Sequence, residues 1–239
     1  GFVRYLEGVD GPRVVCIDDP VIADVVARRP DLDWITYGSS VNADFRFHDV
    51  GSNDGITSFV VSEPRGIETR IVSPLRGLHN VSNVTAVIAM VRSLSIDTRH
   101  VVEAVESFGG VNRRFEIVGT VDGATLVDDY AHLPAEIDAV LAAARDESDD
   151  WRRVIAVFQP NRFHRMAVMS DEYRDAFRHA DVTVITDIYA SGTERIDGVT
   201  GHLVVDAVRR AHPEARVVWC AERSELIDFV AREARAGDL

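Results

Sequence analysis

Two adjacent carboxylates, Asp128 and Asp129, stand at the end of a short apolar run at residues 125–127. Neighbouring acids repel one another unless a positive group lies close by. A tyrosine and a histidine, Tyr130 and His132, follow at once. Carboxylates, a phenol and an imidazole within one short stretch can bind a charged ligand or transfer protons. The rest of the chain must then supply the positive groups.

Two more polar clusters follow strand-like runs. The first covers residues 159–165 and contains Asn161, Arg162 and Arg165, and the second covers residues 187–192. In an open parallel sheet, ligands bind beyond the carboxyl ends of the strands, where all three clusters would share one edge. We expect the two arginines to be the positive partners of the paired carboxylates, in a site for an anionic or zwitterionic substrate. The alternative is a structural cluster of ion pairs at loop ends.

A fourth cluster, residues 77–83, reads G-L-H-N-V-S-N. It places Asn80 and Asn83 one turn apart at a predicted helix start, directly after His79. Two amides that face the same way can read both the donor and the acceptor edges of a purine. Asparagine is also a favoured N-cap residue, so capping is the alternative for Asn80. Capping leaves Asn83 without an explanation.

The apolar pattern predicts two domains that meet near residues 109–112. The first contains strands at residues 14–17 and 34–37 with a helix at residues 20–28 between them, an antiparallel excursion at residues 43–72 and two helices at residues 79–94 and 98–108. The second begins with a hairpin that turns at residues 122–123. Strands then alternate with amphipathic helices, which predicts a parallel sheet with helices on both faces. The second domain's predicted strands are residues 115–121, 124–127, 154–158, 182–186 and 217–219, and its predicted helices are residues 134–146, 165–179, 203–211 and 223–234.

Two arginines, Arg113 and Arg114, stand at the predicted boundary. Paired arginines at a domain hinge can clamp a phosphate through charge-assisted hydrogen bonds. Exposed linker arginines with no ligand are the alternative.

Composition narrows the class of protein. The 239 residues carry a formal net charge of −13, which argues against broad binding to nucleic acid or to anionic membranes. No apolar run reaches the length of a membrane span, and the charged start is unlike a signal peptide. We interpret Cys16 and Cys220 as reduced thiols of a cytoplasmic protein, not as a disulfide. All 26 basic residues are arginine, so the chain contains no phosphate-loop lysine.

Four motifs, taken in order, resemble the Mur ligase family of ATP-dependent amino-acid-adding enzymes. They are G-x-H-N-x-x-N, R-R-F-E, V-D-D-Y-A-H-x-P-x-E and F-Q-P-x-R-F-x-R, and the last two are most similar to the L-alanine-adding members. The resemblance implies an α/β fold: residues 1–111 are similar to the later part of the central P-loop-type ATP-binding domain, and residues 112–239 to most of the Rossmann-like C-terminal domain. The UDP-sugar domain, the glycine-rich phosphate loop and the last strand have no counterpart here. We therefore expect a piece of a longer protein that does not hydrolyse ATP by itself.

The resemblance also implies a reaction and roles for residues. ATP would phosphorylate the carboxylate of UDP-N-acetylmuramate, and L-alanine would attack the acyl phosphate, with magnesium held mainly by groups outside this chain. The expected catalytic residues are Asp129, His132 and Arg114. The nucleotide would be bound by His79, Asn80, Asn83, Arg114 and Asp129, and the amino-acid pocket would be lined by Tyr130, His132, Asn161, Arg162 and Arg165.

Two positions depart from the motifs of the L-alanine-adding members. Leu133 replaces a second histidine, and Asn161 replaces another histidine. Leucine loses a hydrogen-bonding group, so a murein-peptide-recycling ligase of the same family is an alternative. A non-catalytic module that keeps the ligase fold is a second alternative. A phosphoacceptor receiver domain also has paired acids after a strand, but it needs a lysine that this chain lacks.

Overall fold

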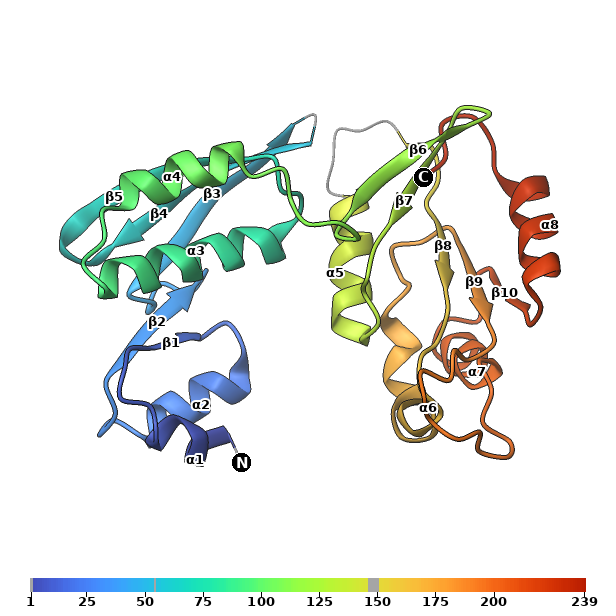
Figure 1. Ribbon diagram of the computed structural model, residues 1–239, viewed down its shortest axis with the longest axis horizontal. Coiled ribbons are helices and arrows are strands. Elements are labelled where there is room, and N and C mark those ends of the chain that lie inside the picture. The colour runs from blue at the N-terminus through green and yellow to red at the C-terminus, as the bar shows by residue number, and fades with distance from the viewer. Residues whose placement is uncertain (1, 54, 146–150) are drawn as a thin grey trace. The chain divides into compact units, whose positions relative to one another are not determined.

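The computed structural model describes residues 2–53, 55–145 and 151–239, and the chain forms two compact units. The N-terminal unit is Gly1–Gly110 and the C-terminal unit is Val111–Leu239 (Figure 1).

Among the described residues, no helix combines the length and the apolarity that crossing a bilayer requires. Cys16 and Cys220 are free thiols, as predicted, and burial raises the pKa of the Cys220 thiol.

The N-terminal unit is built on a five-stranded sheet in chain order. Its first three strands are parallel, and the last three are antiparallel, which confirms the predicted antiparallel excursion. The strands are β1 (Arg13–Cys16), β2 (Trp34–Gly38), β3 (Phe45–Asn53), β4 (Ile56–Glu63) and β5 (Ile67–Ser73). Strand β4 buries Phe59 and Val61 two residues apart, because alternate side chains of a strand face the same side.

Helices α3 (Leu78–Ser93) and α4 (Thr98–Ser107) bury their apolar stripes in the core of this unit, where Ile88 of α3 meets Phe59 and Ile71 of the sheet. Helix α2 (Pro20–Arg28) begins as the sequence predicts, because the Asp19 carboxylate caps it and Pro20 fits the first turn. The short helices α1 (Phe2–Glu7) and η1 (Pro64–Gly66) were not predicted.

The C-terminal unit contains two separate sheets. Strands β6 (Glu116–Val121) and β7 (Ala124–Asp128) form an antiparallel hairpin that turns at Asp122 and Gly123, both with positive φ. Strands β8 (Ile155–Phe158), β9 (Val182–Thr186) and β10 (Val217–Cys220) form a parallel sheet in the order β10-β9-β8. The expectation that all strand ends of this unit share one parallel sheet is therefore wrong for β7, since its hydrogen-bonded strand neighbour within the described residues is β6.

Helices cover both faces of the parallel sheet, as predicted. Ile185 of β9 packs into the same core as α5 (Pro134–Arg145) and α7 (His202–Ala211), whereas Val182 and Val184 pack towards α8 (Arg223–Glu233). All five residues of β9 are buried, and all five, V-T-V-I-T, have β-branched side chains, which suit a strand covered on both faces. The last residue predicted for α5, Asp146, lies outside the described residues.

The predicted helix at residues 165–179 is instead two segments. An α-helix, α6 (Phe163–Met169), passes into a tighter 3₁₀ segment, η2 (Ser170–Asp175). Tyr173 of η2 is fully buried, and its ring stacks on Phe158 with 5.5 Å between the ring centroids. The tertiary packing of this tyrosine accompanies the change in helix type, which sequence periodicity cannot report.

The last three residues of the chain lie between β7 and β8, as Figure 1 shows. The Thr125 N–H donates to the Asp238 carbonyl (2.9 Å), and the Ile155 N–H donates to the Leu239 carbonyl (2.7 Å). A cavity of about 280 Å³ borders these residues, lined mainly by apolar side chains of β7, β8 and α5. Residues 237–239 thus join the hairpin to the parallel sheet.

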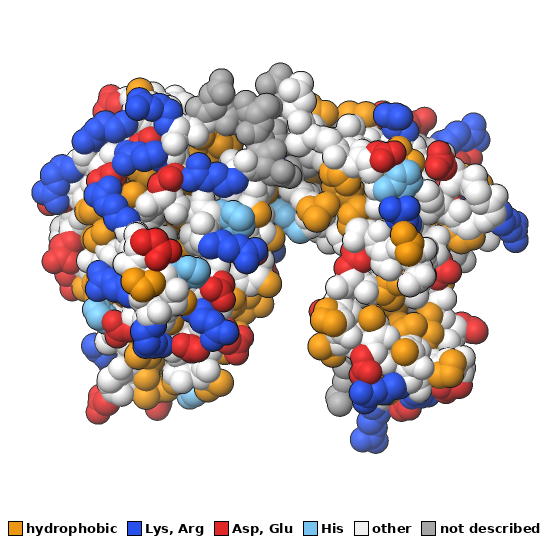
Figure 2. All heavy atoms as spheres, turned by 180° about the vertical axis from the view of Figure 1, so that it is seen from behind, with side chains coloured by type: hydrophobic (Ala, Val, Ile, Leu, Met, Phe, Trp, Pro, Cys, Tyr) orange, Lys and Arg blue, Asp and Glu red, His pale blue; other side chains and the backbone are white. Residues whose placement is uncertain are grey.

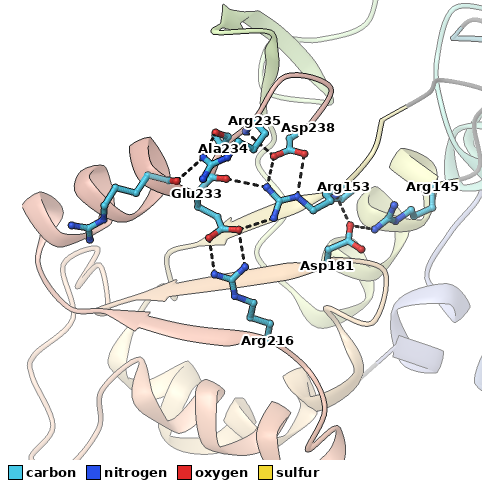
Figure 3. Close-up of polar contacts among 10 residues, drawn as sticks. Arg145, Arg153, Asp181, Arg216, Glu233, Ala234, Arg235 and Asp238 are labelled. Carbon is cyan, nitrogen blue, oxygen red and sulfur yellow. Dashed lines mark hydrogen bonds and ion pairs between the residues drawn. The ribbon is translucent and has the colours of Figure 1, made fainter.

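A network of ion pairs ties together the amino ends of β8 and β10 (Figure 3). Arg153 contacts Glu233 and Asp238, each at 2.6 Å, and Arg216 contacts Glu233 at 2.6 Å. Hydrogen bonds from Arg216 and Arg153 lower the pKa of Glu233 to about 2. Figure 2 likewise shows arginine and carboxylate side chains intermixed on the visible face of this unit. Because ligands of open α/β sheets bind beyond the other strand ends, we interpret this network as structural.

Candidate active site

The richest polar cluster is residues 128–136, here called the acid loop, which leads from β7 into α5. Asp129 accepts hydrogen bonds from the backbone N–H groups of Phe115 and Ala131, both at 2.7 Å. One carboxylate therefore fixes the bend of its own loop and fastens the loop to the segment that precedes β6. Charge-assisted bonds of this kind are about twice as strong as neutral ones.

Asp128 has a different environment. Its carboxylate pairs with Arg113 at 3.1 Å, and both side chains are about half exposed. The prediction that Arg162 and Arg165 neutralise the paired acids is wrong: within the described residues, neither arginine forms an ion pair with Asp128 or Asp129. The physical reason is that a neighbouring arginine and two backbone N–H groups reach the acids first.

Tyr130 carries an exposed aromatic ring in the acid loop, and two guanidinium groups lie near this ring. The Cζ atom of Arg113 lies 5.0 Å from the ring centroid, and that of Arg114 lies 5.9 Å away, which is within the range of cation–π attraction. The Tyr130 N–H also donates to the Arg113 carbonyl at 2.8 Å. The boundary arginines and the acid loop are thus one cluster, which brings Arg114, Asp129 and Tyr130 together.

His132 lies in the same loop with its ring edge against Tyr130, and the two ring centroids are 5.4 Å apart. The carbonyl of His132 accepts a hydrogen bond of 2.7 Å from the Tyr173 hydroxyl. Arg165 lies near enough to Tyr173 to influence its pKa, although desolvation has the largest effect and raises that pKa to about 12. Tyr173 therefore links the acid loop to the neighbourhood of Arg165.

The second cluster is residues 159–165, here called the arginine loop, at the carboxyl end of β8. Its backbone is tied to the end of β9: the Arg162 N–H donates to the Tyr189 carbonyl (2.9 Å), and the Tyr189 N–H donates to the Pro160 carbonyl (2.8 Å). The expectation that the second and third polar clusters share one edge is confirmed by these bonds. The Arg165 guanidinium group donates to the Asn161 Oδ1 atom at 3.4 Å, and Arg162 is exposed.

Arg162 has a backbone φ of 67° and ψ of 121°, a combination that side-chain-bearing residues rarely adopt. Such a residue costs of order 1–3 kcal/mol in backbone strain, and strain of this kind gathers at binding and catalytic sites. The backbone bonds to Tyr189 hold this conformation in place.

In the N-terminal unit, residues 77–83 begin α3. Gly77, with φ 84°, is the N-cap and no side chain caps the helix, so the capping alternative for Asn80 is wrong. The Asn80 amide instead donates to the Arg76 carbonyl (2.7 Å) and lies 3.1 Å from the His79 Nε2 atom. The Asn83 amide nitrogen lies 3.5 Å from the Asn80 Oδ1 atom, and Asn83 is exposed. The two amides face each other on the helix surface, as their spacing predicts.

Two contacting residues received no role from the sequence: Glu136 and Tyr173. Glu136 accepts hydrogen bonds from the N–H groups of His132 and Leu133. Glu136 is the third residue of a helix that starts with Pro134. A glutamate at this position often caps the start of its own helix, so the sequence did contain this signal. Tyr173 gave no signal, because its contact with His132 spans 41 residues.

Both units of the chain match models of known protein families. Residues 113–239 match the Mur ligase glutamate ligase domain, and residues 6–91 match the Mur ligase middle domain. The UDP-N-acetylmuramate–L-alanine ligases of Sinorhizobium medicae and Xanthobacter autotrophicus are 36% and 40% identical to the chain, over 99% of its length and 51% and 52% of theirs. The chain thus spans about half the length of the curated relatives it matches.

The fold also has solved counterparts. The UDP-N-acetylmuramate–alanine ligase of Thermotoga maritima superposes with a TM-score of 0.71 at 23% identity, covering 94% of this chain and 46% of that one. At this identity the likeness concerns the fold alone. With one family domain matched over more than half of its residues and a second over most of the N-terminal unit, the chain belongs to the Mur ligase family.

Proposed function

We propose that the chain supplies the adenine-reading and amino-acid-binding parts of an ATP-dependent ligase that joins L-alanine to UDP-N-acetylmuramate in cytoplasmic peptidoglycan synthesis. The observation that carries the proposal is the 36–40% identity to ligases of that name across both units. Residues 1–111 would be the later part of the central ATP-binding domain, and residues 112–239 most of the C-terminal domain.

In the proposed nucleotide site, the amides of Asn80 and Asn83 read the adenine edge, with His79 beside them. Support comes from the 3.5 Å contact between the two amides and from the exposure of Asn83. Amide side chains carry both donors and acceptors, as a purine edge requires. Arg114 and Asp129 of the C-terminal unit would face the nucleotide phosphates, and the cation–π contact of Arg114 with Tyr130 limits the freedom of its guanidinium group.

In the proposed amino-acid site, the arginine loop binds the carboxylate and the acid loop meets the amine. Arg162 and Arg165 present planar guanidinium groups, which suit a carboxylate, and Asn161 adds an amide beside Arg165. His132 takes the proton that the amine must lose before it attacks the acyl phosphate, and Tyr130 forms the adjacent wall.

The phosphates of ATP need groups that this chain does not provide. The sequence has no lysine, and the described residues include no group of three or more His, Cys, Asp or Glu that could hold a metal ion. These described residues offer no magnesium site, so no step of the proposal is assigned to magnesium, whose ligands we expect mainly outside this chain. We expect the isolated 239-residue chain to show no ligase activity. Phosphate release by the purified chain that depends on both ATP and L-alanine would contradict this expectation.

The nucleotide assignment is tested in a complete ligase that carries both units and a phosphate-binding loop. Asn83→Ala should raise KM for ATP and weaken the preference for ATP over GTP, because a lost hydrogen-bonding partner in a purine site costs about 1–3 kcal/mol. Asn161→Ala makes the same chemical change in the C-terminal unit and should leave the ATP/GTP preference unchanged. An unaltered preference in the Asn83 variant would contradict the adenine-reading role.

A murein-peptide ligase is the second candidate, because Leu133 lacks the hydrogen-bonding group of the L-alanine-adding motif. Its backbone N–H remains bonded to Glu136, so the change affects the side chain only. The two functions separate when a complete ligase is offered UDP-N-acetylmuramate with either L-alanine or a murein peptide. Faster product formation with the peptide would favour the second candidate.

A further inference from the structure

The imidazole of His132 has two hydrogen-bond acceptors beside its Nδ1 atom. The Tyr130 carbonyl oxygen lies 3.1 Å from Nδ1, and the Oε2 atom of Glu136 lies 3.4 Å from it. A carbonyl oxygen and an ionised carboxylate can only accept hydrogen bonds. A neutral imidazole must therefore carry its proton on Nδ1, which leaves the lone pair on Nε2.

Glu136 is itself held firmly in the first turn of α5. Its Oε2 atom accepts the N–H groups of His132 at 3.0 Å and of Leu133 at 3.1 Å. Burial opposes ionisation of this carboxyl group, but these two donors, together with His132 and Arg114, lower its pKa overall. The same oxygen atom thus caps the helix and faces the imidazole as an anion.

The backbone of His132 is held from its other side by Tyr173. The hydroxyl of this fully buried tyrosine donates to the His132 carbonyl at 2.7 Å. Residue 132 is therefore fixed at its N–H by Glu136, at its carbonyl by Tyr173 and at its ring by Tyr130 and Glu136. Its side chain is 28% exposed, so the ring remains accessible.

Three arginines and the carboxylate of Glu172 also lie in the neighbourhood of this histidine. The charge of Arg114 favours the ionised form of Glu136, and in the surroundings of Tyr173 the charge of Arg165 opposes the effect of Glu172 on the tyrosine pKa. The guanidinium group of Arg113 lies over the Tyr130 ring. Glu136 is the carboxylate within contact distance of the His132 ring among the described residues.

We propose that Glu136 is a positioning residue, which together with the Tyr130 carbonyl holds His132 in the Nδ1–H form and directs the Nε2 lone pair to the amino group of the incoming amino acid. This consequence for catalysis rests on the proposed ligase function. In the step, the amine proton passes to Nε2, the nitrogen lone pair forms the amide bond at the acyl carbon, and the bond from that carbon to the phosphate oxygen breaks. The resulting imidazolium is stabilised by Glu136 at Nδ1–H.

The tautomer is measured on the 239-residue chain itself by nitrogen NMR of the histidine rings at a pH where His132 is neutral. We expect the Nδ1–H form to exceed the Nε2–H form by about tenfold or more in the wild type, the ratio that one retained hydrogen bond of ~1.4 kcal/mol gives. Glu136→Ala should shift the ratio towards the Nε2–H form, whereas Glu136→Gln, which keeps an acceptor oxygen, should shift it less. Asp138, on the same helix, pairs with Arg178 instead, so Asp138→Asn should leave the tautomer ratio of His132 unchanged.

A predominant Nε2–H form in the wild type, or an unchanged ratio in Glu136→Ala, would overturn the positioning role. Circular dichroism of each variant separates these results from a loss of folding. The catalytic consequence is tested in the complete ligase, where Glu136→Gln should lower kcat about tenfold and alter its pH profile while KM for ATP stays the same. Unchanged kcat and pH profile would overturn that consequence. Absence of ligation by the wild-type enzyme would instead overturn the proposed function, and the NMR result would stand.

Discussion

The acid loop and the arginine loop both follow strands of the C-terminal unit, but they differ in whether their charged side chains bond to their own backbone. In the acid loop, Asp129 and Glu136 each accept two backbone N–H groups at 2.7–3.1 Å. In the arginine loop the backbone is fixed by bonds to Tyr189, whereas within the part of the chain that the structure describes Arg162 and Arg165 form no ion pair, and Arg165 donates to the Asn161 side chain at 3.4 Å. The carboxylates of the first loop set the geometry of that loop, whereas we expect the guanidinium groups of the second loop to bind a ligand.

The largest expected effect is a difference in the free energy of unfolding between variants of the two adjacent acids, Asp128 and Asp129. Asp129→Ala leaves the N–H groups of Phe115 and Ala131 without their acceptor, so we expect it to destabilise the C-terminal unit by about 2 kcal/mol. Asp128→Ala, the matched control, removes only an exposed ion pair and should cost less than about 0.5 kcal/mol. Urea unfolding and amide hydrogen exchange at residues 115 and 131 measure both. Equal costs for the two variants would remove the distinction between a structural acid and a surface acid.

The second effect concerns ligand binding by the arginine loop. Arg162→Lys keeps the charge but loses the planar fork, so in a complete ligase KM for L-alanine should rise by roughly tenfold, the equivalent of ~1.4 kcal/mol. KM for ATP should change much less. If instead thermal stability falls and KM for L-alanine is unchanged, Arg162 is structural and resembles the acids of the other loop.

A smaller effect tests the backbone strain at Arg162. Glycine accepts the φ of 67° without steric cost, so Arg162→Gly should stabilise the chain by about 1 kcal/mol. Arg162→Ala removes the same guanidinium group but keeps a Cβ atom in the strained conformation, so it should bring no gain. The two variants are compared by urea unfolding. Equal stabilities would show that the backbone conformation is not strained.

The smallest expected effect is a difference between the two loops in how acid affects the exchange protection of their backbone amides. The pKa of Glu136 is below its ordinary value of 4.5, so its stabilising contribution is complete above that pH and is lost as the pH falls through the folded-state pKa. Protection of the His132 and Leu133 amides against exchange should therefore fall below about pH 4.5. The Arg162 amide, which donates to a backbone carbonyl, should serve as the reference. Glu136→Gln should abolish the difference, and a persistent difference would assign it to another group.

Sequence alone predicted the local features that depend on neighbouring residues. The buried strand β9, the start of α2 at Pro20 and the hairpin turn at Gly123 follow from apolar runs, fixed proline φ and glycine at positive φ. The facing amides of Asn80 and Asn83 follow from helical spacing. Each of these outcomes is decided within a few residues.

The errors lie where distant segments decide the outcome. The pairing of Asp128 with Arg113 spans 15 residues, and the bond between Tyr173 and His132 spans 41. The strand neighbours of β7 and the 3₁₀ conformation around Tyr173 also depend on packing against residues far along the chain. The sequence alone indicated which charged residues belong to the candidate site. Which residue pairs with which could be known only from the fold.

The position of residues 237–239 between β7 and β8 has a consequence for the order of folding. These residues bond to Gly123 and Thr125 and also to Arg152, Arg153 and Ile155, which lie more than 80 positions earlier in the chain. Contacts of such sequence separation form slowly, because a long loop must close before they contribute. On the ribosome, the hairpin and the parallel sheet can therefore form early but cannot be joined until residue 239 has emerged. The connection between the hairpin and the parallel sheet of the C-terminal unit therefore forms only after these residues are synthesised.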